Sequence, residues 1–250
     1  GKSPAEVQPA PLRVFVMGRN EWRDEGEWPL ARTQVQDWHL RAGGRLTREA
    51  PGDEPPDEYD YDPADPAPTR GGNHSIGPYN PGLYEMAPPG PYDQRAVEAR
   101  ADVLTYTSEV LEEDLEVTGM VTMTLFAASS APDTDFVARL CDVCPDGRSI
   151  NITEGVIRAR FREDLWGAPR LMEAGTVVEF TIDLDATSNV FLAGHRLRLD
   201  LTSSNFPLWD RNLNTGGDQV TETLWRVAHQ TVWHNATRPS RVRLPVLPAR

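Results

Sequence analysis

The sequence predicts an all-β protein, an antiparallel jelly-roll β-sandwich with long irregular loops. Three observations lead to this expectation. Apolar and polar residues alternate with a period of two in one segment after another, the pattern of strands with one buried face. No stretch beyond one or two turns carries the 3.6-residue period of a helix. The 22 proline and 19 glycine residues are typical of many short strands joined by turns.

The composition limits the partners of the chain. A net charge of −13 and an isoelectric point near 4.8 disfavour nucleic acid, because binding phosphates requires a basic face. No apolar run approaches the about 18 residues that span a membrane, so no membrane partner is expected. The chain begins at Gly1 without a charged and then apolar leader, from which we expect a cytoplasmic location.

The domain boundaries are predicted from the length of 250 residues and from the positions of the Pro- and Gly-rich stretches. Residues 1–11 contain three prolines and no period, and we expect a linker or a disordered lead-in there. Residues 12–250 are expected to form a single sandwich domain of the galactose-binding-domain-like type, interrupted by a long loop at about residues 50–100.

The first strands are short. Residues 12–18 form an apolar run that ends at a glycine, and residues 36–40 form a second run with Trp38 directed inward. Between them, Trp22 and Trp28 stand among charged residues, and we expect their rings to cover an edge of the domain.

Residues 50–90 have no period and are rich in Pro, Gly, Asp, Asn and Tyr. Their acidic run suggests calcium, but Pro63 stands where an EF-type loop needs its sharp turn, so we expect a solvated, Pro-stiffened loop without metal or other cofactor. A loop of this length is usually functional or disordered, and its tyrosines argue against disorder. The acidic residues are Asp53, Glu54, Asp57, Glu58, Asp60, Asp62 and Asp65.

Strands dominate the rest of the chain. They are predicted at residues 103–107, 116–127, 135–143, 149–161, 176–184 and 241–246, and around Leu197, Leu199 and Leu201. The sequence Pro145-Asp146-Gly147 is a turn between two of them, because Pro fixes φ and Gly accepts a left-handed conformation, so a hairpin is expected.

Candidates for a catalytic or metal site are weak. A serine nucleophile on a strand-to-helix turn has the pattern Gly-x-Ser-x-Gly, whereas Asn73-His74-Ser75-Ile76-Gly77 lacks the first glycine and has no helix after it. His229 and His234 are five residues apart, a spacing that suits neither a helix face nor a metal pair, and His195 is expected to be a surface or structural imidazole.

The two cysteines, Cys141 and Cys144, are not accompanied by a second pair or by a suitable histidine pair, so zinc is not expected. Positions three apart on a strand point to opposite faces, so a disulfide between them is not expected either. We predict reduced thiols and no catalytic or metal-binding residue in this chain.

Residues 205–212 form a segment too apolar for a free loop and too irregular for a strand. We expect this segment to pack against other residues, and two alternatives are open. It can contact another domain, or its aromatic rings can close the end of this domain's own sandwich. The residues expected in the interdomain contact are Asn205, Phe206, Trp209, Asp210, Arg211 and Asn212.

An ordered series of short motifs gives the chain a family resemblance. The motifs are Val14-Phe15-Val16-Met17-Gly18, Glu21-Trp22-Arg23-Asp24-Glu25, Trp28-Pro29, Tyr61-Asp62-Pro63-Ala64-Asp65-Pro66, Gly71-Gly72, Asp93-Gln94-Arg95, Asp133-Thr134-Asp135-Phe136, Ser203-Ser204-Asn205-Phe206-Pro207 and Asp210-Arg211-Asn212. In this order, over about residues 12–247, the chain resembles the C-terminal β-sandwich domain of the bacterial cocaine esterase and Xaa-Pro dipeptidyl-peptidase family, which includes α-amino-acid ester hydrolases.

This resemblance implies a three-part serine hydrolase, in which an α/β-hydrolase domain carries a Ser-Asp-His triad, a helical cap is inserted in it, and this non-catalytic domain packs on both. The parent polypeptide is then an esterase or a dipeptidyl-peptidase that cleaves a small ester or peptide, and this chain alone is expected to be inactive. By the same resemblance, the segment after Gly71-Gly72 approaches the acyl pocket. The residues expected to line that pocket are Asn73, His74, Ile76, Tyr79 and Tyr84.

Two other functions remain open at this point. A jelly roll can serve as a stand-alone carbohydrate- or ligand-binding module, for which Trp22, Trp28, Tyr59 and Tyr61 among acidic residues are the candidate platform. The domain can also mediate homo-oligomerisation.

Overall fold

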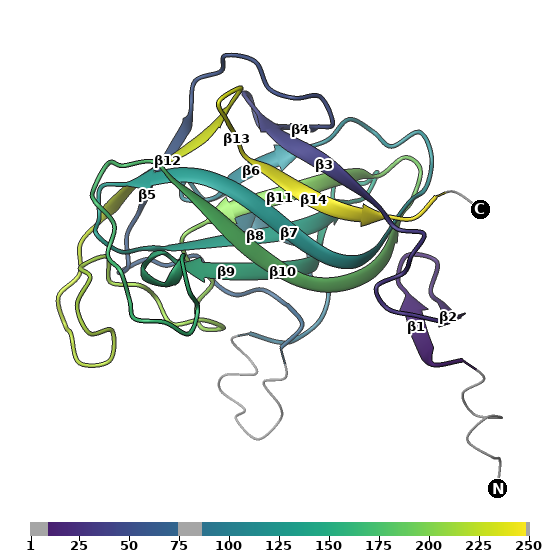
Figure 1. The fold of residues 1–250 in the computed structure, drawn as a ribbon, viewed down its shortest axis with the longest axis horizontal. Helices are drawn as coiled ribbons and strands as arrows, with labels where there is room; N and C mark the ends of the chain where they lie inside the picture. Colours follow the sequence, from purple (N-terminus) through teal and green to yellow (C-terminus); the bar gives the residue numbers. More distant parts are fainter. Residues whose placement is uncertain (1–9, 75–86, 249–250) are drawn as a thin grey trace, which may run out of the picture.

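The computed structural model describes residues 10–74 and 87–248 (Figure 1). The lead-in expected at residues 1–11 therefore lies outside the described residues, apart from its last two positions. The strands are β1 Leu12–Val16, β2 Glu21–Glu25, β3 Gln34–Arg41, β4 Arg45–Thr47, β5 Asp57–Tyr61, β6 Leu104–Thr107, β7 Leu115–Ser129, β8 Asp135–Val143, β9 Ser149–Arg158, β10 Val178–Phe191, β11 Arg196–Thr202, β12 Ala228–Asn235, β13 Arg238–Pro239 and β14 Arg241–Val246. Two short helical turns, α3 Arg95–Glu98 and η1 Ala159–Phe161, complete the described elements.

Twelve strands join in one large sheet that folds over on itself. Its order is β13-β12-β7-β14-β3-β4-β6-β11-β8-β9, with β10 beside β7 and β5 beside β12. Among the described strands, β4 and β6 form the single parallel pair, and the others are antiparallel. The sheet closes into a sandwich where β10 lies on β9, because Thr153 Oγ donates to the carbonyl oxygen of Leu184. The predicted all-β sandwich is confirmed.

The core lies between the two layers of this sheet. The inward positions of the alternating strands are fully buried, as the period of two predicts: Val121, Met123 and Leu125 on β7, Phe180, Ile182 and Leu184 on β10, Leu197, Leu199 and Leu201 on β11, and Val242 and Leu244 on β14. Each such side chain contributes roughly 1.5–3 kcal/mol when it leaves water. The predicted hairpin is present, with Val143 opposite Ser149 and Gly147 at φ +87°.

Parts of the region predicted as a long loop are regular. β5 lies inside it and pairs with β12, with Tyr59 and Tyr61 directed inward. Two acidic residues of this region have buried or half-buried partners, since Glu54 bonds Arg41 and Asp57 accepts from the hydroxyl of Tyr106. Within the described residues, no helix is long and apolar enough to cross a membrane.

The small hairpin β1–β2 stands apart from the large sheet (Figure 1). It is tied to the body by a parallel bridge, in which the amide of Met17 donates to Ser188 O at 2.9 Å and the amide of Val190 donates to Met17 O at 2.9 Å. Gly18 follows this bridge at φ +81°, and a Cβ there would overlap the carbonyl oxygen of Val190, so this position requires glycine. The hairpin consequently projects from the sandwich in a fixed position.

Candidate functional site

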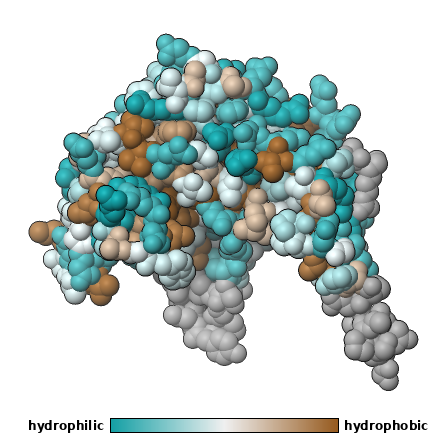
Figure 2. All heavy atoms as spheres, in the orientation of Figure 1, coloured by the Kyte–Doolittle hydropathy of each residue, from teal (hydrophilic) through white to brown (hydrophobic). Residues whose placement is uncertain are grey.

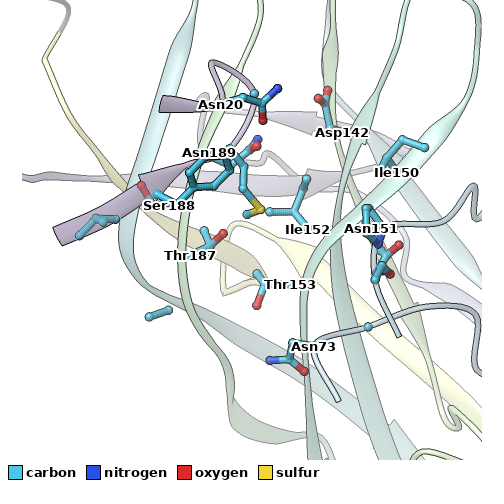
Figure 3. A pocket seen from close by; sticks show the side chains of 18 of the residues that line it. Asn20, Asn73, Asp142, Ile150, Asn151, Ile152, Thr153, Thr187, Ser188 and Asn189 are labelled. Carbon is cyan, nitrogen blue, oxygen red and sulfur yellow. The ribbon is translucent and has the colours of Figure 1, made fainter. Parts of the chain in front are cut away.

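A groove of about 1040 Å³ lies between the β1–β2 hairpin, strands β9 and β10, and the loop stems at Gly72 and Gly90. Figure 3 shows Ile150, Ile152 and Thr153 of β9 facing Thr187, Ser188 and Asn189 of β10 across it. Most of its lining is apolar. The groove combines segments from four separate parts of the sequence, which is why no local pattern predicted it.

Large apolar side chains are exposed along the hairpin side of this groove. Phe15 is 39% exposed, Met17 36% and Trp28 39%, and all three line the groove. Phe15 also contacts Trp22 in an edge-to-face arrangement with ring centroids 5.2 Å apart. Several large apolar residues exposed together are typical of a surface that another protein segment covers.

The loop stems beside the groove form a tight backbone bridge. The amide of Gly72 donates to Gly90 O, and the amide of Gly90 donates to Gly72 O, both at 2.9 Å. Asn73, predicted to line the substrate pocket, is exposed and does line the groove. His74 is half-buried, with Nε2 3.1 Å from Gly71 O. The other predicted pocket residues, Ile76, Tyr79 and Tyr84, lie outside the described residues.

Two polar residues of β9 support these stems from below. The side chain of Asn151 accepts from the amide of Tyr92 at 2.7 Å and donates to Gly90 O at 3.3 Å. Glu154 is buried, and its Oε2 accepts from Arg139 Nε at 2.8 Å. Sequence reasoning did not single out either residue. The sequence offers one clue, a carboxylate and an amide inside a segment predicted as a strand.

The segment 205–212 divides into buried supports and exposed side chains. Asn205 and Asn212 are buried, whereas Phe206, Asp210 and Arg211 are exposed and Trp209 is half-buried. The backbone of Phe206 pairs with residues 67 and 69, through bonds of 2.9 Å and 2.7 Å. Much of this segment therefore packs on its own domain, and the interdomain contact stays a prediction for its exposed members.

Asn212 sits in a buried acidic network. Its Nδ2 donates to Asp133 Oδ2 at 2.7 Å and to Asp135 Oδ1 at 2.8 Å. Burial raises the pKa of Asp135, and the guanidinium of Arg158, bonded to both of its oxygens at 2.9 Å, opposes that shift. Arg158 also reaches Asp210 at 3.0 Å, so this network fixes the end of the segment.

Three histidines, His195, His229 and His234, pair with carboxylates. His195 Nδ1 lies 2.8 Å from Asp142 Oδ1, His229 Nδ1 lies 2.8 Å from Asp60 Oδ1, and the buried His234 Nε2 lies 3.0 Å from Asp57 Oδ2. In the ranges 10–74 and 87–248, no serine hydroxyl is hydrogen-bonded to a histidine ring. Ser75 lies outside those ranges. These contacts are hydrogen-bonded pairs of a histidine and a carboxylate, without a serine.

Among the described residues, one cluster has ligand atoms close enough together for a metal ion. Glu98, Cys141 and Asp200 each place such an atom within 4.8 Å of the others. Arg198 bonds Glu98 at 2.5 Å, and Arg139 NH1 lies 3.9 Å from Asp200 Oδ2. Two guanidinium groups beside the carboxylates disfavour a further cation. Cys141 and Cys144 are both free thiols, as predicted, and burial raises the pKa of Cys141 well above its ordinary value.

Comparisons with known proteins place this geometry in context. A profile of the X-Pro dipeptidyl-peptidase C-terminal non-catalytic domain matches residues 5–243. Cocaine esterase of Rhodococcus sp. (strain MB1 Bresler) is 45% identical over 247 residues, covering 94% of this chain and 42% of the esterase.

Two solved structures are also similar. An aminopeptidase from the marine sediment archaeon Thaumarchaeota archaeon has a TM-score of 0.83 at 30% identity, covering 94% of this chain and 40% of the aminopeptidase. An α-amino acid ester hydrolase has a TM-score of 0.84 at 28% identity, covering 94% of this chain and 41% of the hydrolase. The chain thus spans about two fifths of the length of these relatives.

Proposed function

This chain belongs to the X-Pro dipeptidyl-peptidase C-terminal non-catalytic domain family, and we propose that it forms one wall of the substrate pocket in a longer serine hydrolase. The family assignment confirms the resemblance on which the sequence analysis relied. In the proposed assembly, the hydrolase part of the polypeptide supplies the nucleophile and its base, and cleaves an ester or amide through an acyl-enzyme. The present domain supplies shape and support.

The apolar groove is the observation that carries this proposal. At about 1040 Å³ it lies at the upper end of the sizes of small-molecule pockets, and its hairpin side exposes three large apolar side chains. A segment of the hydrolase or cap domain fits such a surface better than a small polar ligand does. Asn73 lines the same groove, so a domain seated there would lie directly beside the segment after the paired glycines.

A second apolar area lies at the opposite end of the molecule. Figure 2 shows apolar side chains at the left-hand end, over the loops that follow β9 and β11. The exposed residues of these loops include Leu165, Trp166, Val220 and Leu224. Trp166 of this area lies outside the groove lining and outside the hydrogen bonds that link residues 67–69 to the segment 205–212, so it offers a matched control for the groove.

The alternative of a carbohydrate-binding module loses two of its four candidate aromatics. Tyr59 and Tyr61 are buried, with hydroxyl groups bonded to Ser203 and to the backbone of Asn212. Trp22 and Trp28 remain exposed, but Trp28 belongs to the groove. Two rings without neighbouring tyrosines make a weaker sugar platform than the sequence suggests.

The test uses the complete polypeptide encoded by the reading frame that contains this chain. Phe15→Ser and Met17→Ser should lower kcat/KM for ester hydrolysis about tenfold or more, because a small displacement of a pocket wall misplaces the substrate. They should also speed proteolysis between the domains. Trp166→Ala, which truncates an aromatic that is 96% exposed at the other end, should change neither. Unchanged kinetics and proteolysis in the groove variants, or full ester hydrolysis by the present chain alone, would overturn the proposal.

A further inference from the structure

The paired glycines that precede the predicted pocket-lining residues and the segment 205–212 both contact one buried carboxylate, that of Glu154. Glu154 Oε2 accepts from Asn205 Nδ2 at 3.1 Å as well as from Arg139 Nε. On its other side, Glu154 Oε1 faces the first glycine stem, since a Cβ built on Gly72 would lie 2.6 Å from it. Glu154 therefore contacts the base of both segments at once.

A β-bulge explains how β9 presents two polar side chains to these loops. In the pairing with β8, Leu140 is opposite Thr153 but Cys141 is opposite Asn151, so Ile152 is an extra residue. Without it, Asn151 and Glu154 would point to opposite faces of the sheet. With it, both point to the outer face, beneath the loops.

The two polar residues contact the glycine stem in different ways. Glu154 packs against Gly72 through Oε1, which has no hydrogen-bond partner among the described residues, whereas the side chain of Asn151 bonds the backbone of Gly90 and Tyr92. Gln94 strengthens the Gly90 side, because its Nε2 donates to Arg70 O at 2.6 Å and to Asn151 Oδ1 at 3.1 Å. Hydrogen bonds thus fix the Gly90 side of the stem to β9, and the Gly72 side packs on Glu154.

The neighbouring segment is tied to the same point. The carbonyl oxygen of Asn205 accepts from Thr69 Oγ at 2.9 Å, and Leu208 N donates to that hydroxyl at 3.0 Å. Residues 67–69 lead directly into the glycine stem. A shift of the Glu154 carboxylate would therefore move the glycine stem and the Asn205 segment together.

We propose that Glu154 and Asn151 are positioning residues, which hold the glycine stem at Gly72 and Gly90 and the Asn205 segment in a fixed relation to the groove. The part of the proposal that concerns catalysis rests on the function proposed above. The part that concerns the rigidity of the glycine stem rests on the geometry alone. The remote location of Glu154, beneath the loops and outside the groove lining, means that it acts through the backbone and not by contact with substrate.

The amides of Gly72 and Gly90 report directly on this support, because each is bonded across the stem. In the present chain, Glu154→Gln should speed hydrogen exchange at these amides about tenfold, since it removes the charge from a buried bond with Arg139. Asn151→Ala should do the same at Gly90. Amides of β7 should keep their protection. Asp146→Asn, in the exposed turn of the same hairpin, is the control and should leave the stem unchanged.

In the complete polypeptide, the same Glu154→Gln substitution should raise KM for ester substrates with a smaller change in kcat. Faster hydrogen exchange at Gly72 and Gly90 without any change in KM would support the positioning of the stem by Glu154 but refute the function as a pocket wall. Unchanged exchange at Gly72 and Gly90 in folded Glu154→Gln would overturn the positioning role. If Glu154→Gln does not fold, unchanged exchange at Gly90 in Asn151→Ala would overturn that role instead.

Discussion

Asp200 provides the sharpest test of the electrostatics of this domain. It lies on β11, is 1% exposed, and has one carboxylate oxygen without a hydrogen-bond partner among the described residues. Its other oxygen receives a weak bond from Cys141 Sγ at 3.6 Å. Burial, followed by the charge of Glu98, raises its pKa from 3.8 to about 7, while Arg139 and Arg198 oppose that rise.

The sign of the effect on stability follows from this raised pKa. Between about pH 4 and pH 7 the folded protein keeps a proton on Asp200 that the unfolded chain has lost, so the stabilising contribution is complete below pH 4 and is lost as the pH rises toward 7. Three pKa units correspond to about 4 kcal/mol at 1.36 kcal/mol per unit. For a domain of this size, that is a shift in melting temperature of about 10 °C.

Asp200→Asn keeps the shape of the side chain and removes the titration. We expect the variant to be more stable than the parent at pH 8, by up to about 4 kcal/mol, and the difference to shrink toward pH 4.5. Thermal unfolding followed by circular dichroism from pH 4.5 to 8 measures both chains, and their difference cancels the titration of the other carboxylates. A difference in melting temperature between variant and parent that stays constant from pH 4.5 to 8 would refute the reasoning.

Three further substitutions test the fold and the site. Gly18→Ala should release the β1–β2 hairpin, because the new Cβ overlaps the backbone of Val190, and limited proteolysis in the hairpin should speed up without a change in the far-ultraviolet signal of the sandwich. Asn212→Ala should cost about 2–4 kcal/mol in urea unfolding, because two buried aspartates lose a shared donor. Leu199→Ala, in the centre of the core, should cost about 2–5 kcal/mol by the same assay.

The strands that sequence analysis located are those in which the inward residues are all apolar. β7, β10, β11 and β14 have this pattern, and their inward faces are buried as expected. β12 was missed because its inward face includes Gln230 and His234, which satisfy buried hydrogen bonds with Thr134 and Asp57. Such a strand has no apolar period to detect, and only its partners in the sheet define it.

The candidate site was predictable only in part, for a similar reason. Gly71-Gly72 and residues 205–212 are each a single continuous run in the sequence, so their composition and motifs could be recognised. The groove needs the bridge between Met17 and Asn189, and the loop support needs a bulge at Ile152. Both depend on pairings between residues far apart in sequence, which period and composition do not record.

The buried charges of this domain are concentrated under its irregular loops and not between its layers. Glu154, Arg139 and Asp200 lie side by side across β9, β8 and β11, since Arg139 is opposite each of the other two in register.

Apolar side chains could fill the space of these three residues at no loss of stability, because the attraction within a buried ion pair rarely exceeds its desolvation cost. They could not hold the Asn205 segment in one orientation, because dispersion contacts have no direction, whereas the hydrogen bond from Asn205 to Glu154 does. A pocket wall must keep its position to within a fraction of an ångström. We therefore expect that an apolar replacement of this charged row, such as Arg139→Met with Glu154→Leu and Asp200→Leu, would keep the melting temperature of the sandwich and still loosen the Asn205 segment and the adjoining glycine stem, which hydrogen exchange at Gly72 and Gly90 would measure.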